Sequence, residues 1–472
     1  MMHAEATRTR SKVFPKVGPW CASVSFAATI AALGIWLFVN VPDLRRYLVL
    51  ASLGCALLCV LGIVLQQRSA GGRRPLGEIA EAACDQAAER GHDSGADVTA
   101  LPRTLPSRRG QQFRSLAWVI GLSTVLIGVF ALAVGSPQRS ELVERIHSAG
   151  AEFGVARAEK VTDVQRKSSR GKDPYTATVV VQLPAKTGAE YVSATVKPTT
   201  NEPLSPGDPV TVLYAPAEPR LGAVAGDERS LGAELRGETM PAYLRWLFVA
   251  AWVLSCVAAV GHVSAKHGFR SYARLGKQDK AIRGQYTRVG GPGVFAGPGS
   301  QGKDVYLEIR TDSGWVHFRT GVGKHVLPEV MEGQQLWLCW DAHRGVRGSR
   351  ISPSRTSAAL VFDTGLVVHG MVSVDEMRSL SDSGVSVGRL SPPPRGDRSL
   401  QLFDPRSQWP LLVEPLALQT CVVVIACASV LTFDVTTGWR WAAGIVGFLG
   451  AFAASGSYVS EDAPPERAAA SR

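Results

Sequence analysis

The chain has 472 residues, 46% of them hydrophobic, and a formal net charge of +11. A single soluble domain is not expected, because one hydrophobic core stops growing at about 250–300 residues. Apolar windows with almost no charge, each long enough to cross a ~30 Å hydrocarbon layer, alternate with charged segments rich in Gly, Pro and Arg. This alternation predicts an α-helical polytopic membrane protein.

Six windows have the length and composition of transmembrane helices. The first exceeds the apolar region of a signal peptide, usually about 7–15 residues, and a second window follows at once, so we expect a retained anchor. The sixth is rich in Gly and Ala. Its small residues Ala443, Gly447, Ala451 and Ser455 form a stripe through which helices, or two copies of the chain, could pack closely. The windows are residues 20–39, 47–65, 115–134, 243–263, 410–433 and 441–459.

Lys and Arg near the window ends predict the orientation, because these residues favour the cytoplasmic side. They place both termini in the cytoplasm, at a bacterial inner membrane. Arg45 and Arg46, in the first outer turn, oppose this bias and are outnumbered. The expected order is a cytoplasmic N-terminus (1–19), a transmembrane hairpin (20–65), a cytoplasmic linker (66–114), span 3 (115–134), an extracytoplasmic module (135–241), span 4 (243–263), a cytoplasmic module and linker (264–409), a second hairpin (410–459) and a cytoplasmic tail (460–472).

The excess positive charge lies mainly on the predicted inner side. Topological bias explains it, and attraction to anionic lipid headgroups on the cytoplasmic side is a second interpretation. The lipid bilayer is therefore the expected partner, and nucleic acid is not. Most cysteines lie inside the windows, and the outer segment has none, so it is not expected to be a disulfide-stapled domain.

The linker between the second and third windows contains one expected helix. "PLGEIAEAACDQAAERG" begins with Pro75 and stops at Gly91, and its apolar face of Leu76, Ile79 and Ala83 is small. The rest of the linker, "HDSGADVTALPRTLPSRRGQQ", is polar and is expected to be flexible.

The outer segment predicts a small β module. A short helix comes first, with Ser136 as its cap, Pro137 in its first turn and Gly150 at its end. Strand-like runs with Gly, Pro, Ser and Lys between them then predict a small antiparallel sheet or barrel. These runs are residues 154–165, 175–184, 190–198 and 209–216.

The inner segment has strand-like runs in the same order, which predicts a diverged internal repeat with one copy on each side of the membrane. The alternative is that any two small β modules look alike at this level. One or two further strands are expected within residues 358–372, and a polar linker over residues 379–399. The four matching runs are residues 282–289, 304–311, 314–320 and 334–341.

The run "GDPVTVLYAPAEP" in the outer segment has a structural interpretation. A Gly-Asp turn starts a strand, alternate residues share one buried face, and prolines prevent pairing beyond its end. No catalytic role is expected for these residues. They are Gly207, Asp208, Val210, Val212, Tyr214, Pro216 and Pro219.

Through these residues, together with Tyr175 and Gly188 in and after the preceding strand, the outer segment resembles the bacterial domain-of-unknown-function family numbered 3592. The resemblance covers about residues 150–225 and implies a small β-rich module framed by transmembrane helices. It implies no activity. The inner copy departs from the pattern, because Trp340 and Asp341 replace the Tyr-x-Pro ending.

Several short runs match catalytic motifs, but the sequence around each match does not fit the motif's structural setting. "GVSVG" around Ser386 matches the nucleophile elbow in letters only, because it lies in the expected linker and no His follows His369. The Gly-rich run 289–304 lacks a G-K-[ST] ending, and Asp363-Thr364-Gly365 has no second copy. Cys55 and Cys59 have no further metal ligands nearby. No catalytic, cofactor-binding or metal residue is predicted.

Ionisable residues lie only near the window ends, Glu414 beside Pro415 among them, and this predicts an interfacial start to the fifth span. The favoured function is a non-enzymatic scaffold, sensor or partner-binding protein. The alternatives are a transport or channel component, which would show substrate-dependent flux, and a membrane enzyme, which would need a polar cluster.

Overall fold

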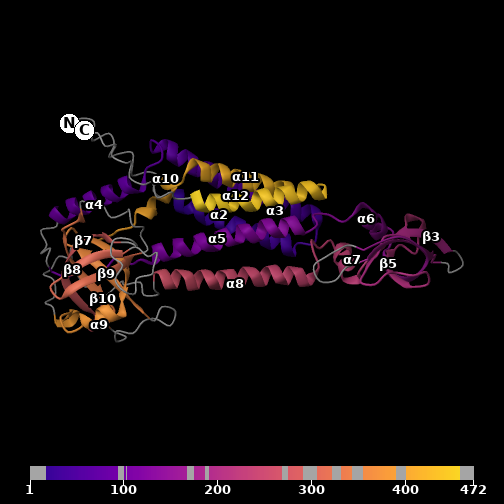
Figure 1. The fold of residues 1–472 in the computed structure, drawn as a ribbon. Coiled ribbons are helices and arrows are strands. Elements are labelled where there is room, and N and C mark those ends of the chain that lie inside the picture. The colour runs from indigo at the N-terminus through magenta and orange to yellow at the C-terminus, as the bar shows by residue number, and fades with distance from the viewer. Residues whose placement is uncertain are drawn as a thin grey trace, which may run out of the picture.

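The computed structural model describes residues 17–93, 100–101, 104–166, 175–186, 191–267, 275–290, 306–320, 331–342, 354–389 and 400–457. A bundle of long helices separates two β modules, which lie at its opposite ends (Figure 1). This confirms a bundle of long apolar helices with two β modules. If the bundle crosses a membrane, the modules face opposite sides of it.

The bundle helices are long because their windows lack both charge and interior proline. Four helices in the described residues have the length and composition of membrane spans, or five if a bent pair counts as one. Six were predicted; helix α12 does not pass this test, although it packs against α5 and α11. The bundle contains α2 (Val17–Phe38), α3 (Pro42–Ser69), α5 (Arg109–Val134), α8 (Ala242–His267), α10 (Trp409–Leu412), α11 (Pro415–Leu431) and α12 (Thr437–Ser457).

The fifth predicted span is broken, which corrects the expectation of one continuous helix. The segments before and after the break meet at 66°. Pro415 cannot donate a backbone hydrogen bond to the carbonyl of Leu411, which accepts instead from the amide of Arg74 at 3.1 Å. Gln67 of α3 satisfies two more carbonyls at the break, donating through Nε2 to those of Pro410 and Val413, both at 2.8 Å. Glu414 stands at the N-cap of α11.

The small-residue stripe of α12 packs within the chain. A side chain added at Gly447 would meet Val129 of α5 at 3.2 Å and Cys427 of α11 at 3.3 Å, and one at Gly444 would meet Ala133 at 2.8 Å. The stripe therefore lets three helices approach closely, as such stripes do where lipid supplies no hydrophobic drive.

Arg45 ties the other end of the bundle to the outer module. It is 1% exposed and donates to the carbonyls of Val39, Gly237 and Pro137, while its guanidinium lies 5.3 Å from the ring centre of Trp36. These bonds satisfy backbone groups where α2 ends and where the module begins and ends. Arg45, which opposed the predicted orientation, thus has a structural role.

The outer module begins with helix α6, and its N-cap is Ser140 rather than Ser136, which corrects the prediction: Ser140 Oγ accepts from the amide of Val143. Gly150, at φ +86°, follows the helix as predicted. The sheet order is β3-β2-β1-β5-β6, with β4 paired to β2. The elements are α6 (Glu141–Ser148), β1 (Glu152–Arg166), β2 (Tyr175–Pro184), β3 (Tyr191–Val196), β4 (Thr199–Thr200), β5 (Pro209–Tyr214), η1 (Pro219–Leu221), β6 (Ala223–Ala225) and α7 (Glu228–Leu235).

The motif strand β5 lies where it was predicted but is buried on both faces. Val210, Val212 and Tyr214 belong to the sheet's core, as expected. Leu213, which points the other way, is fully buried among residues of α6 and α7. The alternation in the sequence did not show this second face, because two separate helices cover it.

The inner module is a closed barrel. Its strands pair in the cycle β7-β8-β9-β12-β11-β10, and β10 pairs back to β7. The two strands expected within residues 358–372 are β11 and β12. Residues 379–389 correct the predicted linker, because they contribute a strand and a turn to the barrel. The elements are β7 (Lys280–Gly290), β8 (Tyr306–Thr311), β9 (Gly314–Thr320), β10 (Gln335–Trp340), β11 (Arg355–Phe362), β12 (Leu366–Ser373), α9 (Val374–Ser379), β13 (Val385–Ser386), η3 (Val387–Arg389), β14 (Gln401–Leu402) and η4 (Pro405–Gln408).

The linker after α3 is packed against the barrel, not flexible, over its described residues. Helix α4 (Leu76–Asp93) buries Ile79, Ala80 and Cys84 among the barrel's interior side chains. Leu101 and Leu105 are buried against the outer surface of the barrel. Burial raises the pKa of the Cys84 thiol to about 12, so the thiol stays protonated. The small apolar face of α4 is enough to hold the helix in place, because the end of the barrel covers that face.

The two modules share more than strand order. The β1–β2 ladder shifts register after Ala158, and the β7–β8 ladder shifts after Tyr286. Gly207 donates to the carbonyl of Ala158 at 2.7 Å, and Gly333 to that of Tyr286 at 2.8 Å. Both glycines have positive φ, 98° and 81°, a conformation that glycine adopts without strain.

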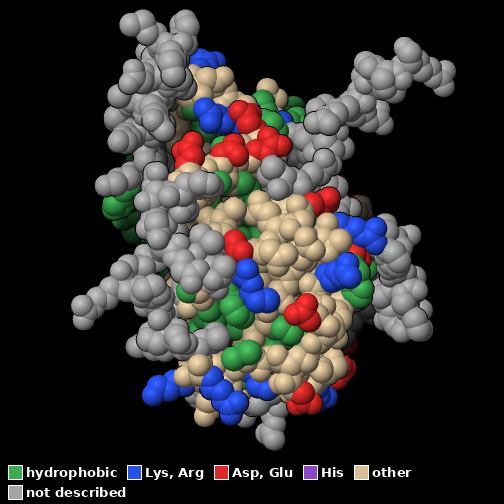
Figure 2. Space-filling model, turned by 90° about the vertical axis from the view of Figure 1, so that its left-hand side faces the viewer, with side chains coloured by type: hydrophobic (Ala, Val, Ile, Leu, Met, Phe, Trp, Pro, Cys, Tyr) green, Lys and Arg blue, Asp and Glu red, His purple; other side chains and the backbone are tan. Residues whose placement is uncertain are grey.

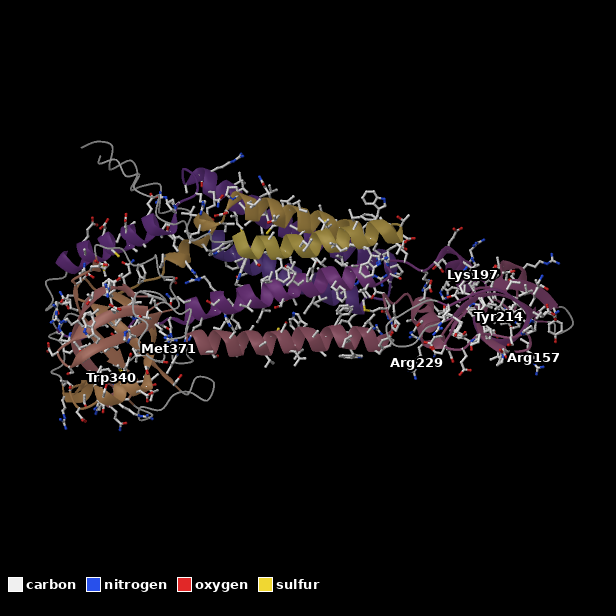
Figure 3. The ribbon with its side chains drawn as sticks, viewed as in Figure 1. Arg157, Lys197, Tyr214, Arg229, Trp340 and Met371 are labelled. Atoms are coloured by element: carbon white, nitrogen blue, oxygen red, sulfur yellow. The ribbon has the colours of Figure 1, made fainter. Side chains whose placement is uncertain are left out.

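The equivalence extends to the next strand. Strands β5 and β10 have the same burial pattern and end in Tyr214 and Trp340, which lie within their respective modules (Figure 3). Both pair with the first residue of the module's long strand, Glu152 or Lys280. A common register shift and turn are not general properties of small β modules, so they support the predicted repeat. The two copies differ in whether the sheet closes. In the inner module β12 pairs with both β9 and β11 and completes the barrel, whereas in the outer module β3 lies beside β6 without pairing.

The outer module should fold alone, since its core residues lie between Val143 and Leu231. A fragment from Ser136 to Thr239 should give a β-rich circular dichroism spectrum and a cooperative melt. Tyr214→Ala should cost about 3 kcal/mol, because a large buried ring is lost. Tyr191→Ala is the matched control, since Tyr191 is 62% exposed. A fragment that folds only with its flanking helices would contradict this prediction.

Candidate ligand cavity in the helix bundle

The bundle contains a partly open cavity of about 1040 Å³. This volume is at the upper end of the range for small-molecule sites, about 300–1,000 Å³. Residues of α2, α3, α5, α8, α10, α11 and α12 line it, so it runs along the bundle rather than across one helix pair. Its apolar lining includes Phe26, Leu33, Val49, Ile63, Leu122, Val129, Leu418 and Val424.

Small residues make the room for the cavity. Gly121, Gly128 and Ala56 line it, and a Cβ added to Gly128 would meet no atom within 4 Å. Four of the hydroxyl groups on the wall donate within their own helix: Thr29 to the carbonyl of Ser25, Ser52 to Leu48, Thr124 to Ile120 and Ser455 to Phe452. The interior therefore suits an apolar chain and offers it little hydrogen bonding.

The end of the cavity nearest the barrel is polar. Arg114, in the first turns of α5, forms an ion pair with Asp404, and Gln111 donates to the carbonyl of Phe403 at 3.0 Å. Arg406, in η4, also lines this end. Its Nε atom is buried and has no hydrogen-bond acceptor among the described residues. A guanidinium in such a place favours an anion.

The break between α10 and α11 borders the same end. Leu412, Val413 and Ala417 line the cavity on either side of it, and Arg73 pairs with Glu414 at 3.4 Å. Helices α5 and α11 both start here, and neither has a side-chain cap bond. The positive ends of their dipoles add to the guanidinium groups. We call this end, made by Arg114, Asp404, Arg406 and the break, the polar rim.

The barrel reaches the rim through His369 of β12, which also lines the cavity. Its Nε2 lies 2.7 Å from the carbonyl of Pro106. The neutral ring donates this hydrogen bond and so connects barrel, linker and cavity. Burial lowers the pKa of His369 to about 4, while its bond to Pro106 opposes and the nearby Arg108 reinforces that change.

The sequence motifs lie away from the cavity. Gly207 makes the predicted turn at φ +98°, and Asp208 accepts from the amide of Ser205 at 2.7 Å; Pro219 is buried in η1, after β5, and Pro216 is half-buried. Ser386 lies in the two-residue strand β13, paired with β7. Asp363 forms a two-pronged ion pair with Arg283 at 2.8 and 2.9 Å. Residues 291–304 of the Gly-rich run lie outside the described residues.

One further titratable pair lies on the barrel. His317 Nδ1 is 2.6 Å from Glu376 of α9, and this hydrogen bond raises the pKa of His317. The pair attaches α9 to β9. Within the described part of the chain, no three His, Cys, Asp or Glu side chains are close enough to hold a metal ion.

The barrel end carries both signs of charge. Acidic side chains gather on its upper part in Figure 2, and basic ones lie lower down. Helix α4 exposes Glu78, Glu81, Asp85 and Glu89. This face is therefore mixed, although the chain as a whole is basic.

Comparison with known proteins gives no relative. No protein-family model matches the chain, and no curated protein or solved structure matches it. The site must therefore be interpreted from its own geometry. One sequence feature marked it: Glu414-Pro415, a carboxylate beside a helix breaker within an apolar window. Arg406 and the cavity had no such signal, because η4 follows a polar segment and the lining residues come from seven helices that are far apart in the sequence.

His369 should make the protein acid-sensitive. Its folded pKa is about 4, below the ordinary 6.5, so as pH falls the unfolded chain binds a proton first. The contribution of the neutral ring is complete above pH 6.5 and is lost as pH falls toward 4, by about 2 kcal/mol at pH 5. The melting temperature of His369→Gln in detergent should fall less between pH 7.5 and 5 than that of the wild type. Equal losses would contradict the assignment.

Proposed function

We propose that this protein is a non-enzymatic sensor or scaffold of a bacterial inner membrane, and that its bundle holds a lipid in the central cavity. The observation that carries the proposal is the apolar cavity with a polar rim at one end. An amphipathic molecule with an apolar tail and a polar headgroup matches this division. Such a cavity inside a membrane-spanning bundle would be filled from the bilayer.

The connections of the rim support a sensing role. Gln67, Arg73 and Arg114 join α3, α5 and the α10–α11 break, and His369 joins the same region to the barrel. A ligand at the rim would contact groups that fix the barrel's position on the bundle. A partner protein on the barrel's side of the membrane would then recognise the position that the barrel takes when the lipid is bound.

Transport is the second candidate, and the broken α10–α11 segment favours it. Interrupted helices line the substrate sites of many transporters because non-helical backbone at membrane depth must face protein or a cavity. Purified protein in liposomes should show substrate-dependent flux under this alternative. Under the favoured proposal it binds lipid and gives no flux.

Filling the cavity should expel the ligand. Gly128→Phe would place a ring in the open space beside Gly128. Native mass spectrometry of protein released from lipid nanodiscs should show a retained lipid on the wild type and none on this variant. Gly54→Phe is the matched control, because Gly54 also has open space on a bundle helix but does not line the cavity. Retention by Gly128→Phe would refute the cavity as the binding site.

The proposed orientation puts six spans across the membrane with both termini in the cytoplasm. In a Cys-free chain, Tyr191→Cys, in the outer module, should react with a membrane-impermeant thiol reagent in intact cells. Glu332→Cys, in the barrel, should react only after lysis. Both side chains are exposed, so access to the reagent decides the result. The opposite labelling pattern would reverse the topology.

A further inference from the structure

We propose that the cavity selects an anionic glycerophospholipid, whose phosphate is bound at the polar rim by Arg406. This inference rests on the proposed lipid-binding function and adds the headgroup class and the residue that recognises it.

Of the three arginines placed at the rim above, Arg73, Arg114 and Arg406, two have a carboxylate partner. Arg114 is neutralised by Asp404, and Arg73 by Glu414. Arg406 has no carboxylate partner among the described residues, and its Nε is buried without an acceptor. Burying a donor in this way is costly unless a ligand supplies the acceptor. A phosphate oxygen is the acceptor that a guanidinium fork matches best.

The rim backbone favours the same ligand. Helices α5 and α11 begin there, with 26 and 17 residues respectively, and neither N-cap residue supplies a side-chain acceptor; in α5, Ser107 Oγ accepts from the amide of Arg109 at 3.3 Å. Their N-terminal dipoles stabilise negative charge in the first turn. The two helix N-termini therefore add to the attraction of Arg406 for an anion, while the carboxylates Asp404 and Glu414 are paired with Arg114 and Arg73.

The position of the rim explains why the anion belongs to a lipid. Gln67, at the same end, lies 22 residues along α3 from Arg45, which is about 33 Å at 1.5 Å per residue. That length matches the ~30 Å hydrocarbon core. The rim is thus at headgroup depth and the cavity at acyl-chain depth. A soluble anion would use the rim alone and leave the apolar cavity without a role.

The test compares headgroups with equal chains. Full-length protein is placed in nanodiscs containing equal amounts of phosphatidylglycerol and phosphatidylcholine, and the lipid retained on release is identified by native mass spectrometry. The wild type should favour the anionic lipid roughly tenfold, the size of effect expected for a buried charge-assisted bond. Arg406→Gln should reduce this preference to near unity while still retaining a lipid, and Arg406→Lys should restore part of it.

Arg109→Gln is the matched control. It removes the same charge from the start of α5, yet Arg109 is exposed and does not line the cavity. Its lipid preference should equal that of the wild type. Equal losses in the two variants, or a wild type without preference, would overturn the inference and leave lipid binding intact. A wild type that retains no lipid would overturn the proposed function itself.

A second measurement needs no variant. A photoactivatable group on the acyl chain should crosslink to cavity residues of the wild type from phosphatidylglycerol, and roughly tenfold less from phosphatidylcholine at equal concentration, by the same charge-assisted bond. Equal labelling by both lipids would overturn the selection of an anionic headgroup.

Discussion

Backbone hydrogen bonding at the helix ends is the constraint on which the structure depends. Within a bilayer, no water is available to satisfy a free carbonyl, so the protein must supply a donor. Helix α3 does this at both ends. Arg45 serves the carbonyls of Val39, Gly237 and Pro137, and Gln67 serves those of Pro410 and Val413. Arg440 of α12 does the same for Leu132 and Ala133 at the end of α5.

These bonds place the two β modules and the cavity. Arg45 holds the beginning and end of the outer module against the bundle. Gln67 stabilises a break that a membrane helix would otherwise not tolerate, and the break borders the cavity beside Arg406. The buried donors therefore do more than stabilise helices: they fix the positions of the groups that would meet the headgroup of the proposed lipid.

Periodicity in the sequence predicted most individual elements. The strands at Tyr175–Pro184 and Gly314–Thr320 have the expected bounds, because alternation and flanking turns are local signals. In the linker after α3, the predicted helix is confirmed as α4, but the prediction that the remaining residues are flexible was wrong for those that the structure describes. Ile79 and Leu101 each belong to a short apolar pattern that is weak alone, and they are buried because the distant barrel covers them. The break at Glu414 was visible as a charge beside proline, but its partner Gln67 was not.

The repeat, too, was predictable only where the signal is local in the sequence. The order of strands could be predicted, but the shared register shift and the matching bonds of Gly207 and Gly333 could not, since they depend on pairing between strands. The resemblance of the outer module to the 3592 family stays a prediction. The cavity was beyond prediction for the same reason as the linker, since small residues of five helices open it together.

A density map of the full chain in nanodiscs containing phosphatidylglycerol tests the account most directly. The account predicts elongated density in the cavity between α2, α5 and α11, ending in a headgroup within hydrogen-bonding distance of Arg406, with Gln67 bound to the carbonyls at the break. A collapsed or water-filled cavity, or a continuous α10–α11 helix with Gln67 turned away, would contradict it.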